Sequence, residues 1–148
     1  VLHLHPDTPG ATICADLTKA DHIPSDSFDC IILTFTLQFI FDVRAAIRTV
    51  ARILKPGGVA LLVFPGITQI SRYDMDNWGE FWRFTSLSAR RLFEEVFQPD
   101  DVSVTTYGNV LAATASLQGL ISSELRRDEL DHWDRDYELV IGLRAVKR

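Results

Sequence analysis

The sequence predicts an α/β fold in which helices cover a mostly parallel sheet, and three observations lead to this prediction. Short apolar runs alternate with segments of helical periodicity, and short turns join them. The runs within 28–34 and 59–64 stay apolar over several residues, which is typical of parallel strands buried on both faces. The chain has 148 residues, 47% hydrophobic and 24% charged, which suits one globular domain. We therefore expect residues 1–148 to form a single three-layer α/β domain.

The first half of the chain contains three expected strands, at residues 1–5, 11–15 and 28–34. A helix is expected at 42–54, because its apolar side chains recur at intervals of three and four residues. Asp42 is placed to cap this helix, since its carboxylate can accept the unpaired amide hydrogens of the first turn. Lys55-Pro56-Gly57-Gly58 is expected to end the helix with a tight turn.

The second half is expected to contain a strand at 59–64, a helix capped by Ser86 or Ser88, a strand at 102–107, a helix at 110–127 and a strand at 139–146. Gly119 is a weak point in the last helix. Between them, residues 66–85 form an irregular segment rich in aromatic side chains.

Composition excludes several classes of protein. The net charge of −5 disfavours binding to nucleic-acid backbones, which requires a concentrated basic surface. No apolar stretch approaches the roughly 18 residues of a membrane span, and the first residues do not resemble a secretory signal. Cys14 and Cys30 lie in apolar runs, so we expect buried free thiols and a cytoplasmic location.

Two segments carry a family resemblance. Residues 23–32 read IPSDSFDCII, and residues 45–58 read AAIRTVARILKPGG. Together they resemble the fourth strand and the following helix and turn of class I S-adenosylmethionine-dependent methyltransferases, of the type 11 kind. The resemblance implies a Rossmann-like, mostly parallel sheet with flanking helices and an antiparallel last strand. It also implies S-adenosylmethionine as cofactor and methyl transfer to a small-molecule or sugar-type acceptor.

The resemblance places cofactor-binding residues at the ends of two strands. Asp16 falls where the family has an acidic residue that faces the adenine amino group, and Leu17 would lie against the adenine ring. Thr34, Phe35 and Thr36 would border the methionine end. Such positions also suit an open parallel sheet, which binds ligands beyond the carboxyl ends of its strands. The alternative for Asp16 is a local role, as the aspartate of a turn before Leu17-Thr18-Lys19.

The segment after the expected strand at 59–64 is a candidate lid over the acceptor. Its candidate contacts are Tyr73, Asp74, Trp78, Trp82 and Arg83. The alternative is that the two tryptophans simply pack the segment onto the sheet. His3 and His5 share a strand face but lack further ligands at suitable spacing, so we expect no metal site.

One family element is absent from this sequence. The resemblance implies a first strand and a glycine-rich turn upstream of the strand at 1–5, yet no Gly-x-Gly pattern occurs in the chain. The fold is therefore expected to be N-terminally truncated, with a gap in the middle of its sheet. Because unpaired buried backbone groups cost about 1–3 kcal/mol each, we expect the chain to associate, as a homodimer. A non-catalytic remnant that acts as an interaction or oligomerisation module is the alternative function.

Overall fold

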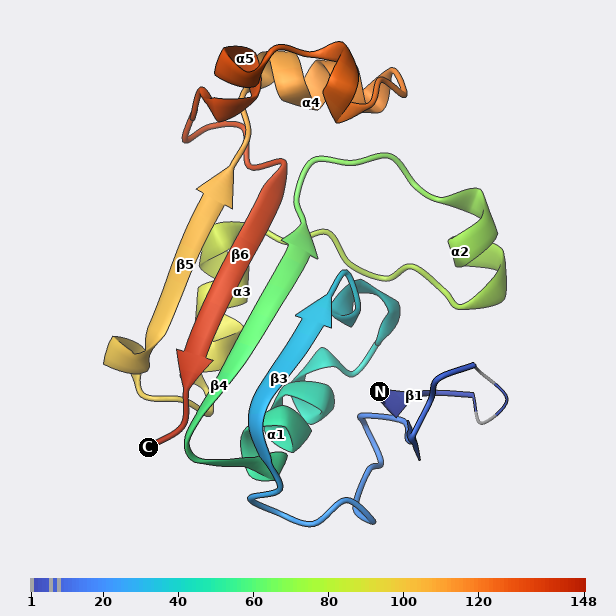
Figure 1. The fold of residues 1–148 in the computed structure, drawn as a ribbon, viewed down its shortest axis with the longest axis vertical. Helices are drawn as coiled ribbons and strands as arrows, with labels where there is room; N and C mark the ends of the chain where they lie inside the picture. The colour runs from blue at the N-terminus through green and yellow to red at the C-terminus, as the bar shows by residue number, and fades with distance from the viewer. Residues whose placement is uncertain (1, 6, 8) are drawn as a thin grey trace.

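A four-stranded sheet forms the centre of the molecule. The computed structural model describes residues 2–5, 7 and 9–148 of the chain. The sheet has the order β3-β4-β6-β5, made by β3 (Phe28–Thr34), β4 (Leu54–Pro65), β6 (Val140–Val146) and β5 (Val102–Tyr107). β3 and β4 are parallel, and β6 is antiparallel to both of its neighbours, so β3, β4 and β5 run in one direction (Figure 1). The expected mostly parallel sheet with an antiparallel last strand is confirmed.

The two N-terminal strands form a separate sheet. β1 (Leu2–His3) and β2 (Ile13–Cys14) pair in parallel, with Leu2 opposite Ile13. They are shorter than the expected strands at 1–5 and 11–15, and Val1 lies outside the described residues. Among the described residues, β3 pairs with β4 alone, so one of its edges has no strand beside it.

Two helices cover one face of the four-stranded sheet (Figure 1). α1 (Val43–Ile53) joins β3 to β4, and α3 (Ser86–Glu94) precedes β5. As expected, Asp42 caps α1, because its Oδ1 accepts a hydrogen bond of 3.0 Å from the amide of Ala45. Ile47 of α1 and Phe93 of α3 are fully buried against the sheet, with Phe64 of β4 between the helices' side chains. The α1 periodicity therefore produced the helix that the sequence predicted.

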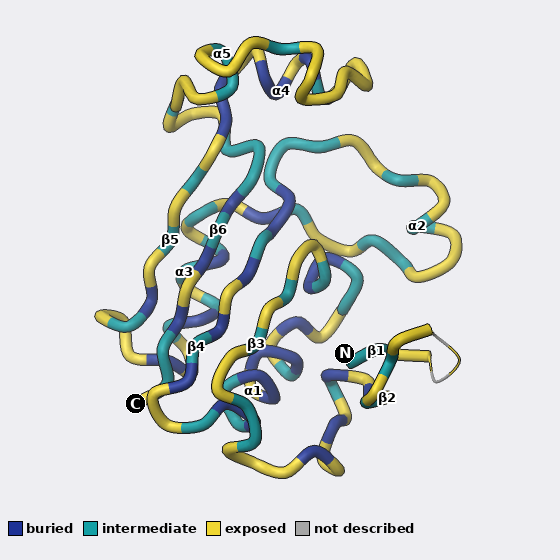
Figure 2. The backbone as a smooth tube through the Cα atoms, in the orientation of Figure 1, coloured by how far each residue is buried: buried dark blue, intermediate teal, exposed yellow. Residues whose placement is uncertain are grey.

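The opposite face of the sheet carries no helix in the described chain, and many of its side chains are exposed (Figure 2). The expectation of a three-layer arrangement is corrected to two layers. The continuous apolar runs of β3 and β4 are typical of strands buried on both faces. In the described chain, however, helices pack on only one face of the sheet. The expectation of buried cysteines is wrong, because Cys14 and Cys30 are free but exposed.

Other boundaries differ from the expected ones for local reasons. Lys55–Gly58 is part of β4 and not a separate turn, because the amide of Gly57 and the carbonyl of Gly58 pair with Lys147 near the chain end. Thr85, not Ser86 or Ser88, caps α3. The expected helix at 110–127 divides at Gly119, whose φ is +83°. The remaining elements are α2 (Arg72–Asn77), α4 (Val110–Leu117), α5 (Arg127–Asp131) and the 3₁₀ turns η1 (Leu37–Phe39), η2 (Pro99–Asp101) and η3 (Ser122–Glu124).

Candidate functional site

The exit of β3 has an unusual backbone. Phe35 follows the last residue of the strand with a φ of +46°, a left-handed conformation that bulky residues rarely adopt. Its amide donates to the carbonyl of Val63, and the hydroxyl of Thr36 donates to the carbonyl of Thr34. The phenyl ring remains 41% exposed. Strained backbone of this kind concentrates at functional sites and costs of order 1–3 kcal/mol. The structure thus keeps Thr34, Phe35 and Thr36 in a fixed turn at the carboxyl end of β3.

A loop covers the region beyond this turn. Residues 66–83, here called the lid segment, leave β4 and return to it, because the amide of Phe84 donates to the carbonyl of Pro65. The lid segment is held to the chain after β3 by two hydrogen bonds: Phe81 N to Gln38 O, 2.8 Å, and Trp82 Nε1 to Ile40 O, 3.0 Å. These bonds connect the candidate acceptor segment to η1 and Ile40, which follow the turn that carries the candidate cofactor residues.

The lid segment has a buried ionic centre. Arg83 pairs with Glu80 at 3.0 Å, and the Glu80 side chain is only 7% exposed. The two terminal nitrogens of Arg83 also donate to the carbonyls of Trp82 and Gln69, and Glu80 accepts from the amide of Ser71. Arg83 is therefore the clamp of the lid segment, so its terminal donors are already occupied within the protein.

The other predicted acceptor contacts are spread along the lid segment. Trp78 contacts His5 with ring centroids 5.2 Å apart, which brings the lid segment against the chain after β1. The Trp82 ring is stacked on Phe41. Tyr73 is 70% exposed and Asp74 lies beside it in α2. The two tryptophans thus contact neighbouring loop residues, whereas Tyr73 presents its ring to solvent, and the acceptor contacts stay a prediction.

Sequence reasoning missed Gln38. This side chain is only 4% exposed, and its Oε1 is buried without a hydrogen-bond partner in the described structure. Nε of Arg83 is likewise buried and unpartnered. The available signal was a single amide in the apolar run LQFIF at 37–41. Buried polar atoms of this kind require an explanation, such as a bound water.

Asp16 makes the local turn that the sequence analysis had left open. Its Oδ1 accepts hydrogen bonds of 2.8 Å from both the amide and the hydroxyl of Thr18. These two bonds, with the nearby charge of Lys19, lower the pKa of the Asp16 carboxyl below its usual value. In the described structure Oδ2 accepts no hydrogen bond, so it is available to a ligand. Leu17 is buried in the main core. Within the described residues, no hydrogen bond or ion pair joins Asp16 to Thr34, Phe35 or Thr36.

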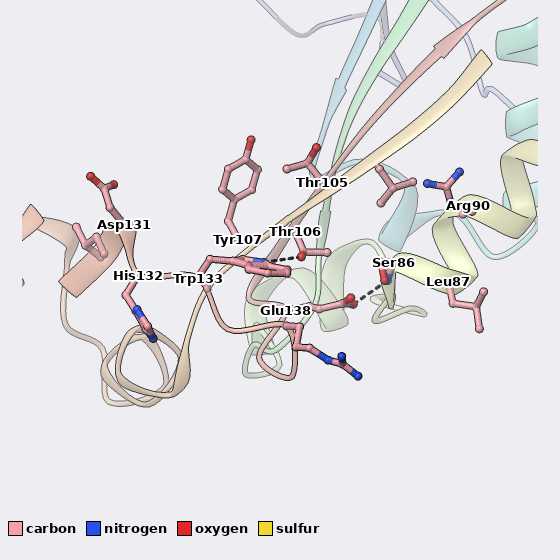
Figure 3. Close-up of a pocket in the computed structure, with 14 residues that line it drawn as sticks. Ser86, Leu87, Arg90, Thr105, Thr106, Tyr107, Asp131, His132, Trp133 and Glu138 are labelled. Atoms are coloured by element: carbon pink, nitrogen blue, oxygen red, sulfur yellow. Dashed lines mark hydrogen bonds between the residues drawn. The ribbon is translucent and has the colours of Figure 1, made fainter. Parts of the chain in front are cut away.

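A separate hollow lies between α3, the end of β5 and the segment around α5 (Figure 3). Several of its polar groups are paired: Glu138 accepts from the amide of Ser86, Trp133 donates to the hydroxyl of Thr106, and Arg90 donates to the carbonyl of Val102. The hollow has a volume of about 880 Å³ and is open to solvent, and the groups that form these three hydrogen bonds are already satisfied. We therefore keep the β3 exit as the candidate site, on geometric grounds.

The described residues lack two further features, a metal-binding cluster and a membrane-spanning helix. They contain no group of three or more histidine, cysteine, aspartate or glutamate side chains arranged to hold a metal ion. Within the same residues, every helix is too short or too polar to cross a membrane.

Comparisons with known proteins agree with the geometry. Residues 3–62 match the family described as "Methyltransferase domain". Over this range, which is 60 of its 148 residues, the chain is similar to methyltransferase domains. The matched range includes the Asp16 turn, β3 with its strained exit, and α1.

The relatives found by sequence are much longer than the part that this chain matches. It is 31% identical over 80 residues to a ubiquinone/menaquinone biosynthesis C-methyltransferase of Pasteurella multocida, covering 54% of the chain and 28% of the relative. It is 43% identical over 51 residues to the protein of that name from Pectobacterium atrosepticum, covering 32% of the chain and 20% of the relative. The matches thus span between a fifth and a third of these relatives.

Solved structures show the same fold. An S-adenosylmethionine-dependent methyltransferase from Archaeoglobus fulgidus superposes with a TM-score of 0.62 at 10% identity, covering 99% of this chain and 74% of that one. One from Mesorhizobium loti gives 0.59 at 20% identity, with 99% and 78% covered. A phosphoethanolamine N-methyltransferase of Haemonchus contortus, solved with S-adenosylhomocysteine, gives 0.55 at 17% identity, with 91% and 36% covered.

Proposed function

We propose that the protein binds S-adenosylmethionine at the exit of β3 and transfers its methyl group to a small-molecule or sugar-type acceptor. The observation that carries the proposal is the strained turn at Phe35, held at the carboxyl end of a parallel strand and bordered by the lid segment. Ligands of open α/β sheets bind at such strand ends. The proposal treats residues 1–148 as one partial methyltransferase domain.

The residues present fit two ends of this cofactor. Oδ2 of Asp16 is the acceptor that an adenine amino group requires, while Oδ1 stays in its turn with Thr18. The backbone from Thr34 to Thr36 and the exposed ring of Phe35 would border the methionine end. When bound, S-adenosylmethionine supplies a methyl group already activated by its positive sulfur.

The protein's own contribution would be positioning. Phe39 stands in the turn after β3 where relatives of this family often have a histidine, so this position supplies no general base. In-line transfer needs the acceptor held close to the methyl group with water excluded. The lid segment supports that role, because Gln38 O and Ile40 O hold it beside the turn.

Calorimetric titration with S-adenosylmethionine and S-adenosylhomocysteine tests the proposal. We expect micromolar binding by the wild-type chain. Asp16→Asn keeps an oxygen for Thr18 but replaces the free Oδ2 with an amide donor, so we expect binding about ten-fold weaker or more, as loss of a charge-assisted hydrogen bond predicts. Asp100→Ala, an exposed aspartate in η2, is the matched control and should bind normally. Absence of heat at millimolar ligand would reject cofactor binding by this chain.

The second candidate function is an interaction or oligomerisation module without catalysis, and the free edge of β3 favours it. Edge strands are normally protected by charge, proline or a covering segment. β5 follows this rule, because Trp133 donates to Thr106 beside it. β3 instead exposes an edge with the apolar sequence CIIL at 30–33. The proposal therefore includes a homodimer in which the two β3 edges pair antiparallel.

Light scattering on the eluted protein measures the dimer directly. We expect twice the mass of the chain at micromolar concentration. We expect a monomer after Ile32→Pro, because Phe35 donates its amide to β4 and the alternation along the strand turns the amide of Ile32 to the free edge. A wild-type monomer would reject the dimer. The proposal also places the protein in the cytoplasm, where the exposed, free Cys14 and Cys30 would remain reduced.

A further inference from the structure

Two buried side-chain atoms of the described chain have no hydrogen-bond partner, and both lie on the segments that lid closure joins. They are Oε1 of Gln38, in η1, and Nε of Arg83, in the lid segment. The other buried side-chain nitrogens and oxygens of the described residues have partners. Unsatisfied groups of this kind are rare in native proteins, because each costs about as much as a lost hydrogen bond. Their occurrence on both sides of one contact therefore indicates a function for that contact.

Gln38 is held between the candidate cofactor turn and the lid segment. It belongs to η1, which begins directly after Thr36, and the amide of Phe39 donates to the carbonyl of Thr36 at 3.1 Å. The carbonyl of Gln38 accepts from the amide of Phe81 in the lid segment at 2.8 Å. The backbone of Gln38 is thus tied on both sides. Its side-chain amide, on a residue only 4% exposed, forms no hydrogen bond within the described chain.

The unpaired amide suits a neutral hydrogen-bonding group. A glutamine amide has an acceptor oxygen and a donor nitrogen, so it can bond to a hydroxyl whichever way it is turned. A charged group beside it would lack a counter-ion, because Arg83 and Glu80 already pair with each other at 3.0 Å. A wholly apolar group would leave the amide unpaired, as it is in the ligand-free chain. A hydroxyl, which both donates and accepts, satisfies the amide without bringing a charge.

We propose that Gln38 is a specificity-determining residue, which hydrogen-bonds a hydroxyl of the acceptor when the lid segment closes over it. The assignment rests on the proposed function, because it gives that site an acceptor class, neutral alcohols and sugars. Sites that bond a substrate hydroxyl reject analogues that lack it, since the site's own polar groups are then left unpaired. The ligand-free lid segment is in this unpaired state, so a bound alcohol should stabilise its closed form.

Hydrogen exchange of the ligand-free chain tests the unpaired amide without any cofactor. Gln38→Met keeps the length of the side chain and removes its polar atoms, so we expect exchange at the Phe81 amide to slow roughly ten-fold. Gln118→Met changes an exposed glutamine at the end of α4 and is the matched control, which should leave this exchange unchanged. Faster exchange in Gln38→Met would show that a buried water already bonds the amide. That result, or unchanged exchange, would overturn the proposal.

The side-chain amide signals of Gln38 in NMR spectra test the ligand class. Their absence in Gln38→Met identifies them. The probes are benzyl alcohol against toluene, and a methyl glucoside against each of its monodeoxy analogues, all with S-adenosylhomocysteine present. We expect an alcohol to shift the Gln38 signals and to slow exchange at Phe81, at a concentration at least ten-fold lower than its analogue requires. Gln38→Met should lose this discrimination.

The outcomes separate this inference from the proposed function. Alcohols and analogues that act alike would overturn the role of Gln38, as would probes that never shift its signals while S-adenosylhomocysteine binds. Failure of the wild type to bind S-adenosylhomocysteine would instead reject the proposed function, and with it the acceptor class. The exchange result on the ligand-free chain does not depend on that binding.

Discussion

Replacing Arg83 with methionine tests whether this side chain clamps the lid segment or contacts the acceptor. The substitution removes the 3.0 Å ion pair with Glu80 and the hydrogen bonds to Gln69 and Trp82. Methionine retains most of the aliphatic volume, so the effect of packing is small. The carboxylate of Glu80, only 7% exposed, is then left without its cation.

The magnitude follows from burial. Removing one partner of a buried ion pair costs about 3–5 kcal/mol. The Arg83 side chain is 27% exposed, so solvent screens part of the interaction, and we expect the lid segment to lose about 2–3 kcal/mol of closing free energy. At about 1.4 kcal/mol per factor of ten, this corresponds to opening that is roughly 30–150 times more frequent.

Native-state hydrogen exchange measures this opening at the amide of Phe81, which is bonded to Gln38 O. Exchange there should accelerate by the stated factor, while exchange at Leu62 in the sheet should change little. The double variant Glu80→Gln/Arg83→Met should lose less than the sum of the two single variants, because the pair acts together. Unchanged exchange at Phe81, or an equal acceleration at Leu62, would refute the clamp.

Two further substitutions test the geometry. Gly66→Ala would bring a Cβ into the backbone oxygen of Glu138, so we expect a loss of several kcal/mol in the free energy of urea unfolding; Gly57→Ala, which meets nothing but has φ +80°, should cost about 1 kcal/mol. Similar losses would argue against the close approach at Gly66. Thr18→Val should raise the pKa of Asp16 by removing one of its hydrogen bonds, as carboxyl NMR titration would show. Since the folded-state pKa of Asp16 is depressed, its stabilisation is present above the unfolded pKa and fades as pH falls through the folded pKa. The variant should therefore lose less stability on acidification, and an unmoved titration would contradict this cause.

Local sequence patterns predicted the strands and helices of the α/β core. The bounds of β3 and the cap at Asp42 agree with the sequence because each depends on neighbouring residues. The uncovered face was not predictable in this way. The segment CIIL at 30–33 is apolar on both sides, which is typical of a strand buried on both faces, yet in the described chain helices cover only one of them. Layer count is a property of the whole molecule, and a strand's composition reports only its preferred surroundings.

The candidate site was predicted in position more than in detail. The order of strands placed Thr34 and Thr36 at a carboxyl edge, but the left-handed φ of Phe35 has no signature in its side chain. Arg83 was predicted as an acceptor contact because it lies in a polar and aromatic segment. Its pairing with Glu80 depends on how the loop folds back on itself. A contact made across a loop is not encoded in periodicity, so sequence patterns did not reveal it.

The single hydrogen bond between Phe84 and Pro65 has a consequence for how this scaffold can diversify. The lid segment leaves β4 at Pro65 and returns beside it at Phe84, so its length can change with little effect on the sheet. Doubling such a loop costs only about 0.6 kcal/mol in closure entropy. Under the proposed function, exchange of the lid segment between proteins would therefore alter which acceptors bind, while the strands keep their alignment.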